Sequence, residues 1–363
     1  MGIAQGAIDC DVHPDSPSVA KLLPYVDPYW RESFTLRGID RLDLSLTSDP
    51  RGAPSRSRPD WRKPGGAVPD VGALQRDLLD PFGLRIAVLN CLHAAAVLFS
   101  EDMGAALCRA VNRWIAEEWL ARDDRLRASI LLPLQNPALA VEEIEHWAQD
   151  RRFIQILVPA ANELTLGRRL YWPVWRAAQH HGLPVAIHAG SAMRHAPTST
   201  GWPSYFVEDY IGQAQAFESA LLSLVMEGVF DDCPELTVVL AESGVSWLPS
   251  FLWRADKTWR GLRNEVPWVR EHPATLIRRH VRMTVQPLDT PDDPDRIARL
   301  LDQIAAPEML LFSTDFPHWH FEGHQALPRS FPADLARRIM VGNPRATYPR
   351  LDATAPLPTG AAA

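Results

Sequence analysis

The stretch that decides the fold is residues 310–318, Leu-Leu-Phe-Ser-Thr-Asp-Phe-Pro-His. A short, continuous apolar run bounded by turn residues is typical of a strand that is buried on both faces. This run ends in Asp315, so the aspartate lies where the strand stops and its loop begins. In an α/β barrel that edge carries the catalytic residues. Taken alone, an aspartate in this place is more often the cap of a following helix, so the other strand ends are needed to decide.

Seven segments upstream have the same strand character and alternate with helical patterns. Strict alternation predicts a parallel sheet, and eight units predict a closed (β/α)8 TIM barrel. The alternative is a doubly wound open sheet, which usually carries a glycine-rich phosphate loop after its first strand; none follows here. We expect strands near residues 8, 86, 128, 154, 184, 236, 281 and 310, and helices over 101–121, 137–150, 170–181, 207–230, 247–263, 294–305 and 332–348.

One long segment interrupts this alternation. Residues 15 to about 80 are irregular, and residues 49–69 are dominated by Pro, Ser, Arg and Gly. A structureless stretch of this length is usually a functional loop or a disordered one. We predict an insertion after the first strand that caps the barrel mouth, with short helices near residues 19–25 and 71–79. The barrel is expected to form one domain over residues 1–350, and the small residues of 351–363 are expected to form a flexible tail.

The composition excludes several classes of protein. The 363 residues are 46% hydrophobic and 22% charged, with a formal net charge of −7, which is ordinary for a globular protein and gives no electrostatic footprint for nucleic acid or an anionic membrane. No apolar run of 18 residues is present, so we expect no membrane span. The four cysteines form no CxxC pair and are typical of reduced thiols in a cytoplasmic protein.

Five polar side chains stand at the C-terminal ends of expected strands. The first strand contributes Asp11 and His13, the fifth His188, the sixth Glu242 and the eighth Asp315. In a barrel these ends meet at one mouth, where two imidazoles and three carboxylates would repel one another without a cation among them. A single histidine at a strand end is more often structural, but five such residues at matched ends indicate a site. Their nitrogen and oxygen atoms are suitable ligands for a divalent metal.

Four motifs carry a resemblance to a known family. Together they resemble the amidohydrolase superfamily, and within it the amidohydrolase-related group typified by aminocarboxymuconate-semialdehyde decarboxylase. That group also contains resorcylate-type and iso-orotate decarboxylases, carbon–carbon hydrolases and lactonases. The resemblance covers nearly the whole barrel. The motifs are an opening D-x-H-x-H, matched by residues 9–13; a helix and a strand ending in histidine, matched by 171–188; S-D-x-P-H, matched by 314–318; and a closing N-A-x-x-x-Y, matched by 343–348.

The sequence departs from the group at two places. The first histidine of the opening motif is Asp11, and the histidine that usually ends strand six is Glu242. The resemblance implies zinc as the usual ion, and His13 and His188 remain suited to it. The extra carboxylates shift the preference toward manganese, iron or magnesium. The chain thus resembles a branch of the group in which Asp and Glu replace two histidines.

The resemblance also indicates how many ions to expect. Binuclear hydrolases of this architecture use a carboxylated lysine on strand four, and residues 153–159 contain none. The chain has only Lys21, Lys63 and Lys257, and none of them lies on an expected barrel strand. We therefore predict one divalent ion, held by ligands from the set Asp11, His13, His188, Asp315 and Glu242.

Three residues are predicted to act in catalysis: Asp315, Glu242 and His318. The resemblance implies that Asp315 contacts both the metal and a water molecule, so it can double as general base. Glu242 is either a further ligand or a proton shuttle that replaces the lost histidine, and the shuttle requires a pKa raised by burial. His318 either orients a ligand, contacts the substrate or only fixes its loop.

Four further residues are candidates for substrate binding. Arg194 and His195 follow strand five, where an arginine can clamp a substrate carboxylate bidentately; a solvated surface arginine fits equally well. Trp319 and Trp202, with His320, are predicted to wall a hydrophobic pocket.

Three functions follow from these expectations. The first is a metal-dependent hydrolase, in which metal-activated water attacks an amide, ester, lactone or carbon–carbon bond of a small carboxylated, cyclic or aromatic substrate. The second is a non-oxidative decarboxylase of an aromatic or unsaturated acid that uses the same mononuclear site; the lost strand-six histidine counts against it. The third is a non-catalytic binding barrel, which is disfavoured because Asp and Glu, the exchanged residues, are side chains that can still bind metal. A homodimer is expected from the resemblance alone.

Overall fold

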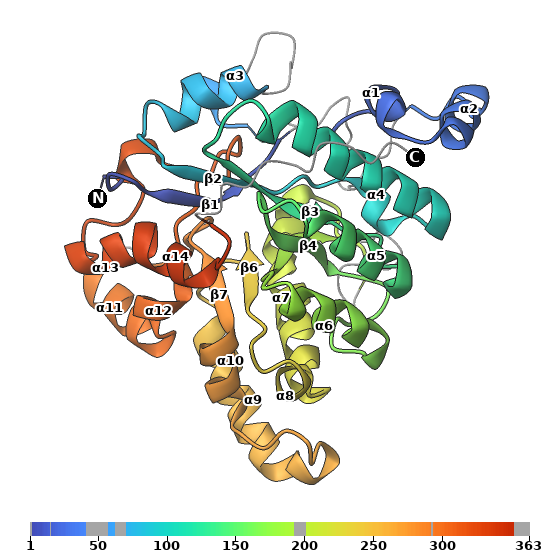
Figure 1. The fold of residues 1–363 in the computed structure, drawn as a ribbon. Helices are drawn as coiled ribbons and strands as arrows, with labels where there is room; N and C mark the ends of the chain where they lie inside the picture. The colour runs from blue at the N-terminus through green and yellow to red at the C-terminus, as the bar shows by residue number, and fades with distance from the viewer. Residues whose placement is uncertain are drawn as a thin grey trace.

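A computed structural model describes residues 2–14, 16–40, 57–61, 70–191, 201–291 and 293–351. Its eight strands form one parallel sheet in chain order (Figure 1). The last strand joins the first through backbone hydrogen bonds, with Cys10 N donating to Phe312 O at 2.9 Å and Asp315 N donating to Asp11 O at 3.0 Å. The predicted (β/α)8 TIM barrel is confirmed. The strands are β1 (Ile8–Val12), β2 (Ile86–Leu89), β3 (Leu126–Leu131), β4 (Phe153–Ala161), β5 (Val185–Ser191), β6 (Val238–Ala241), β7 (Val281–Thr284) and β8 (Leu310–Leu311).

Helices surround the strands, as the alternation predicts (Figure 1). Two short helices were not expected, α10 (Pro273–His280) and α12 (Ala306–Met309). The helix expected over 332–348 consists of α13 (Ala333–Arg337), a π-helical turn (Arg338–Gly342) and α14 (Asn343–Thr347); Pro344 lacks the N–H that a continuous α-helix needs. The others are α4 (Glu101–Ile115) with a π-helical turn (Ala116–Leu120), α5 (Pro137–Trp147), α6 (Trp172–His180), α7 (Phe206–Met226), α8 (Val229–Asp232), α9 (Leu248–Leu262) and α11 (Pro294–Gln303).

The end of the barrel opposite the strand C-termini is closed by the end of the described chain. Apolar side chains of β1, β2, β4, β6 and β8 form one buried cluster with Tyr348 and Leu351. Arg350 Nη1 donates to the carbonyl of Phe153, the first residue of β4, at 3.0 Å, and Arg127 Nε donates to the carbonyl of Leu351 at 3.0 Å. This end is therefore packed and hydrogen-bonded, which leaves the C-terminal edge of the strands as the mouth.

The insertion after β1 contains the expected short helices at its two ends. These are α1 (Val19–Leu22) with a 3-10 turn (Leu23–Tyr25), and α3 (Val71–Leu74) with a π-helical turn (Gln75–Leu79); α2 (Pro28–Arg37) is additional. Residues 57–61 lie against the loop after β8, where Ser57 forms an antiparallel bridge with His318 and Trp61 packs on Phe316 at 4.7 Å. A cap over the mouth remains a prediction. Residues 41–56 and 62–69 of the insertion, and 352–363 of the expected tail, lie outside the described residues.

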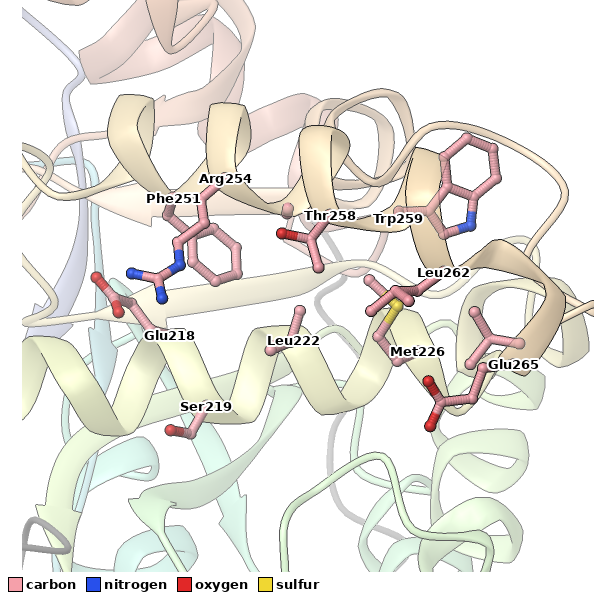
Figure 2. A pocket seen from close by; sticks show the side chains of 12 residues that line it. Glu218, Ser219, Leu222, Met226, Phe251, Arg254, Thr258, Trp259, Leu262 and Glu265 are labelled. Carbon is pink, nitrogen blue, oxygen red and sulfur yellow. The ribbon is translucent and has the colours of Figure 1, made fainter.

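The outer wall of the barrel carries a groove between α7 and α9, with a volume of about 580 Å³ (Figure 2). Figure 2 shows Glu218 and Arg254 at one end, Glu265 at the other, and apolar side chains such as Leu222 and Leu262 between them. Both helices lie outside the sheet, so this groove does not belong to the mouth. Of the helices in the described ranges, none combines the length and the hydropathy needed to cross a membrane.

His93 links the loop after β2 to the start of the insertion. Its ring accepts a hydrogen bond from Ala95 N at 3.1 Å and lies 3.2 Å from the carbonyl of Pro17, and the residue is buried. Burial lowers the pKa of His93 to about 4. The unfolded chain therefore takes up this proton near pH 6.5, but the folded chain does so only near pH 4. The resulting stability is complete above pH 6.5 and is lost as the pH falls toward 4.

We predict that acidification from pH 7 to pH 5 costs the wild type about 2 kcal/mol of unfolding free energy through His93. His93→Asn keeps an acceptor for Ala95 N and removes the titration, so this part of the loss should vanish. Urea unfolding of both proteins at the two pH values measures the difference. An equal acid loss in wild type and variant would contradict the prediction.

Candidate metal centre

Side chains from β1, from β5 and from the segment after β8 meet at the mouth of the barrel. His13 Nε2 lies 2.9 Å from Asp315 Oδ1 and 3.3 Å from Asp11 Oδ1. His188 Nε2 lies 3.4 Å from Asp11 Oδ2. All four side chains are buried. Donor atoms that share one first-row divalent ion at about 2.1 Å, in octahedral geometry, lie about 3 Å from each other. The spacing in this cluster therefore suits a single ion.

The hydrogen bonds of the two imidazoles leave bare atoms pointing into the cluster. His13 Nδ1 donates to the carbonyl of Asn90 at 2.9 Å, and His188 Nδ1 donates to the carbonyl of Ala189 at 2.9 Å. Each Nε2 of a neutral ring is then a lone pair facing a carboxylate. Among the described residues, Asp11 Oδ2, His188 Nε2 and Asp315 Oδ2 are buried and have no hydrogen-bond partner. Bare nitrogen and oxygen atoms that face one another require a positive charge, and a divalent cation fits these donors.

The pKa shifts of these side chains also indicate that the cluster favours a positive charge. Burial alone would lower the pKa of His13, but the carboxylates of Asp11 and Asp315 raise it to about 10. Burial alone would raise the pKa of Asp11, but the His188 and His13 imidazoles hold it below its usual value. The pKa of Asp315 is likewise held low, against burial, by His318 and His13. The cluster thus stabilises positive charge among its carboxylates.

Two carboxylates in or beside the cluster belong to residues with a strained backbone. Glu242 and Asp315 adopt φ angles of 57° and 56°, in the left-handed region that costs a residue other than glycine about 1–3 kcal/mol. Glu242 directly follows β6, and its N–H is held by Thr284 Oγ1 at 3.0 Å. Asp315 is held by the Asp11 carbonyl. Backbone strain of this kind clusters at functional sites.

Glu242 occupies one flank of the cluster. Its Oε1 accepts a hydrogen bond from the Tyr210 hydroxyl at 3.1 Å, and its Oε2 lies 3.7 Å from His188 Nδ1, the nitrogen that faces away from Asp11. Burial, followed by the charge of Asp315, raises the pKa of Glu242. Within the described ranges, two sets of side chains have metal-binding atoms that lie within 4.8 Å of one another. The first set is Asp11, His13 and His188. The second set is His13, Glu242, Asp315 and His318, so His13 belongs to both. Both roles expected for Glu242 are compatible with this geometry.

Asn90 contacts two members of the cluster, Asp11 through its side chain and His13 through its backbone carbonyl. Its side-chain nitrogen donates to Asp11 Oδ1 at 2.8 Å, and its side-chain oxygen accepts from Ser129 Oγ at 2.5 Å and Gln155 Nε2 at 3.0 Å. Its backbone carbonyl orients His13. Asn90 directly follows β2 at the same edge of the barrel, but an asparagine there is neither an acid nor a histidine, so its type does not mark it as a metal ligand. Partners of this kind fix the orientation of metal ligands.

We predict that Asn90→Leu weakens metal binding about 10–100-fold. The backbone carbonyl that orients His13 remains in the variant, so the effect reports the loss of the hydrogen bond to Asp11. Metal affinity is measured by competition with a fluorescent chelator. Ser129→Ala removes a neighbour of Asn90 that does not contact Asp11, and it should change the affinity much less. Equal affinities of wild type and Asn90→Leu would show that Asp11 needs no such support.

The other predicted site residues are placed as follows. His318 Nδ1 lies 2.8 Å from Asp315 Oδ1 and is thus beside the cluster. Trp319 is half exposed, and its ring lies 4.0 Å from that of His320. Trp202 is also half exposed, and within the described ranges it has no polar or ring contact with the cluster. Arg194 and His195 lie outside the described residues.

Tyr210 is a second residue that the sequence did not reveal. It lies on α7, and its ring stacks on His320 with centroids 5.0 Å apart and planes inclined by 16°. His320 Nε2 in turn lies 3.9 Å from Asp315 Oδ2 and 4.0 Å from Glu242 Oε1. A tyrosine within a 21-residue helix carries no pattern that would single it out.

Comparisons with known proteins identify a family for this chain and relatives within it. Residues 8–350 match the family described as Amidohydrolase. The gamma-resorcylate decarboxylase of Polaromonas sp. (strain JS666) is 26% identical over 271 residues, which cover 71% of this chain and 80% of that protein.

Two solved structures share the fold. One is a dihydroxybenzoic acid decarboxylase from Polaromonas sp. JS666 with bound manganese and the inhibitor 2-nitroresorcinol (TM-score 0.64, 19% identity, covering 95% of this chain and 97% of that one). The other is 5-carboxyvanillate decarboxylase from Sphingomonas paucimobilis (TM-score 0.68, 19% identity, covering 95% and 99%).

Proposed function

Because the chain belongs to the amidohydrolase family, we propose that it is a metal-dependent carboxy-lyase that removes CO2, without oxidation, from an aromatic acid with a hydroxyl group beside its carboxylate. The chain is an enzyme of a family in which its relatives are named as decarboxylases. These relatives favour decarboxylation over hydrolysis, the first of the three functions expected from the sequence. The observation that carries the proposal is the buried cluster of Asp11, His13, His188 and Asp315. In it Asp11 Oδ2, His188 Nε2 and Asp315 Oδ2 have no hydrogen-bond partner among the described residues, and His13 belongs to both candidate metal-binding sets.

We propose that Asp11, His13, His188 and Asp315 hold one divalent ion. Manganese is bound in two solved structures of related fold, and two carboxylates among four ligands suit manganese better than a site richer in histidine would. We therefore favour manganese over zinc, iron or magnesium. When bound, such an ion supplies Lewis acidity that fixes the carboxylate and hydroxyl oxygens of a substrate.

Glu242 is proposed as the proton donor. Its raised pKa favours the protonated form, and the Tyr210 hydroxyl occupies Oε1, which leaves Oε2 to carry the proton. As the bond between the ring and the carboxylate breaks, its electron pair stays on the ring carbon and CO2 departs. That carbon then takes the proton from Glu242. Asp315, whose pKa is held low, stays ionised between His13 and His318, and His318 positions it.

The substrate ring is proposed to lie against Trp319 and His320, which pack on each other at the mouth. Arg194 and His195, outside the described residues, remain predicted partners of a substrate carboxylate. Trp202 remains a predicted wall of the pocket.

Product analysis tests the proposed reaction. The manganese-loaded protein is incubated with 2,6-dihydroxybenzoate and other ortho-hydroxybenzoates, and in parallel with lactones, esters and amides of similar size. We expect equal amounts of CO2 and the hydroxyarene from at least one acid. Hydrolysis of the second panel without CO2 from the first would instead support the hydrolase, with Asp315 as base.

Homodimer formation remains a proposal. The outer wall formed by α7 and α9 exposes large apolar side chains, including Ile211, Trp253 and Leu262, and large exposed apolar patches often mark interfaces. We expect light scattering to give the mass of a dimer for the wild type and of a monomer for Trp253→Glu, while Arg299→Glu, an exposed residue of α11 away from this wall, stays dimeric. A monomeric wild type would contradict this.

A further inference from the structure

A second cavity opens at the mouth beside the proposed metal centre. Its volume is about 510 Å³, and it lies between the loop after β7 and the loop after β8. Both loops leave the C-terminal edge of the sheet, where the ligand cluster lies. The volume is within the range of pockets that hold small molecules. This cavity differs from the groove on the outer wall, because His320 and Trp319 line it.

The side chain of His320 lies between this cavity and the ligand cluster. Its Nε2 lies 3.9 Å from Asp315 Oδ2 and 4.0 Å from Glu242 Oε1, while the same residue lines the cavity. Its ring is fixed between Tyr210, stacked at 5.0 Å, and Trp319 at 4.0 Å. The cavity therefore begins one side chain away from the atoms that are proposed to hold the ion and the reacting carboxylate.

Gln286 supplies an unpartnered polar group to this cavity. It follows β7, and its N–H is held by Ser313 Oγ at 3.0 Å. The residue is only 5% exposed and lines the cavity, yet its side-chain amide has no hydrogen bond to any described residue. Because the amide borders the cavity, a ligand group there can replace its water with a direct hydrogen bond. Such an exchange is worth about 0.5–1.5 kcal/mol net.

The other residues that line the cavity indicate which kind of ligand group would bind there. Leu288, Ile297 and Leu327 give apolar contacts, and the charged residues Glu322 and Arg329 are opposite in sign. Asp315 and Glu242 lie just behind His320. Among the described residues that line the cavity, the guanidinium of Arg329 is offset by the carboxylate of Glu322, so a second carboxylate finds no excess positive charge there. A neutral arm that donates and accepts hydrogen bonds and has some apolar surface fits best.

We infer that this cavity is a second binding subsite, which receives a neutral hydrogen-bonding substituent of the aromatic acid, and that Gln286 is the residue that recognises it. The inference rests on the proposed function, which places the carboxylate of the substrate at the ligand cluster. The ring position opposite the carboxylate then points furthest from that cluster. The subsite makes the substrate an aromatic acid with a polar arm rather than a bare hydroxybenzoate.

Nitrophenols allow binding to be measured without turnover, because a nitro group replaces the reacting carboxylate. The probes are 2-nitrophenol, 5-acetamido-2-nitrophenol and 3-hydroxy-4-nitrobenzoate, titrated by calorimetry into the manganese-loaded protein. We expect the acetamido probe to bind about tenfold more tightly than 2-nitrophenol, as one additional hydrogen bond implies. The probe with the second carboxylate should gain nothing.

Two variants complete the test. Gln286→Leu should remove the advantage of the acetamido probe and leave the affinity for 2-nitrophenol unchanged, which also shows that the variant is folded. Gln303→Leu, the same exchange at the end of α11 and outside the cavity lining, should behave as the wild type. Equal affinity of wild type for the two probes, no binding of the acetamido probe, or an equal loss for both probes in Gln286→Leu would overturn the subsite. The expected affinities without CO2 release from any hydroxybenzoate would refute the proposed reaction and leave the subsite standing.

Discussion

Replacing His188 by alanine is expected to weaken metal binding by a hundredfold or more and to slow CO2 release about a thousandfold. Loss of a partner behind a ligand already costs about 10–100-fold in affinity, and removal of the ligand itself should cost at least as much. The Lewis acidity of the ion contributes several kcal/mol to the reaction, and each 1.36 kcal/mol corresponds to a factor of ten in rate. His188 Nε2 is buried, has no hydrogen-bond partner among the described residues and lies 3.4 Å from Asp11 Oδ2, so the alanine variant loses a donor atom that faces the cluster.

Elemental mass spectrometry and a CO2 assay on the same preparations measure the two effects. His181→Ala is the matched control, because His181 pairs with Glu145 outside the ligand cluster. That variant should keep the metal and the rate of the wild type. A His188→Ala protein that retains the full amount of metal would remove His188 from the ligand set.

Glu242→Gln is expected to keep the metal and to lower kcat by about 10²–10⁴, the usual contribution of a positioned acid or base. The amide oxygen of glutamine still accepts the Tyr210 hydroxyl, which now bonds Oε1 at 3.1 Å, but the side chain has no proton to give. KM should change little. If Glu242 is instead a ligand, the variant should lose metal together with activity, so the metal content distinguishes the two roles left open by the geometry.

The pH dependence of kcat provides a further check on Glu242. Its pKa is raised by burial and by the charge of Asp315, and an acid acts only in its protonated form. The rate of the wild type should therefore fall as the pH rises through that raised pKa, and Glu242→Gln should lack this fall. Glu235→Gln, on the exposed surface, serves as control and should keep the profile of the wild type. A pH profile shared by all three proteins would exclude Glu242 as the acid.

The strand ends were the most informative part of the sequence. Asp11, His13, His188, Glu242 and Asp315 were selected because each follows an apolar run, and a barrel brings such ends to one edge. Asp9 shows the limit of that logic, because it is a carboxylate on the same strand as Asp11, two residues earlier, yet it does not join the cluster. In the structure it accepts hydrogen bonds from Thr314 N at 3.0 Å and Thr314 Oγ1 at 2.5 Å, so it ties β1 to the segment after β8. Local periodicity cannot reveal such a partner 305 residues away.

The residues that escaped prediction depend on tertiary contacts. Tyr210 reaches Glu242 from the first half of α7, and only the packing of that helix against the mouth gives it a role. Gln286 follows β7 at the predicted edge, but an amide is no metal ligand of the expected kind, and its significance comes from the cavity beside it. The π-helical turn over Arg338–Gly342 was also not foreseen, since hydrophobic periodicity does not distinguish such a turn from α-helix.

The central claim is that this chain is a decarboxylase that depends on one divalent ion. The most direct measurement is a titration of the chelator-treated protein with manganese, in which bound metal and CO2 release from an ortho-hydroxybenzoate are recorded together. The account predicts no release without metal, a linear rise of rate with bound manganese, and saturation at one equivalent per chain. Release that is independent of metal, saturation at two equivalents, or full metal binding without CO2 from any ortho-hydroxybenzoate would contradict it.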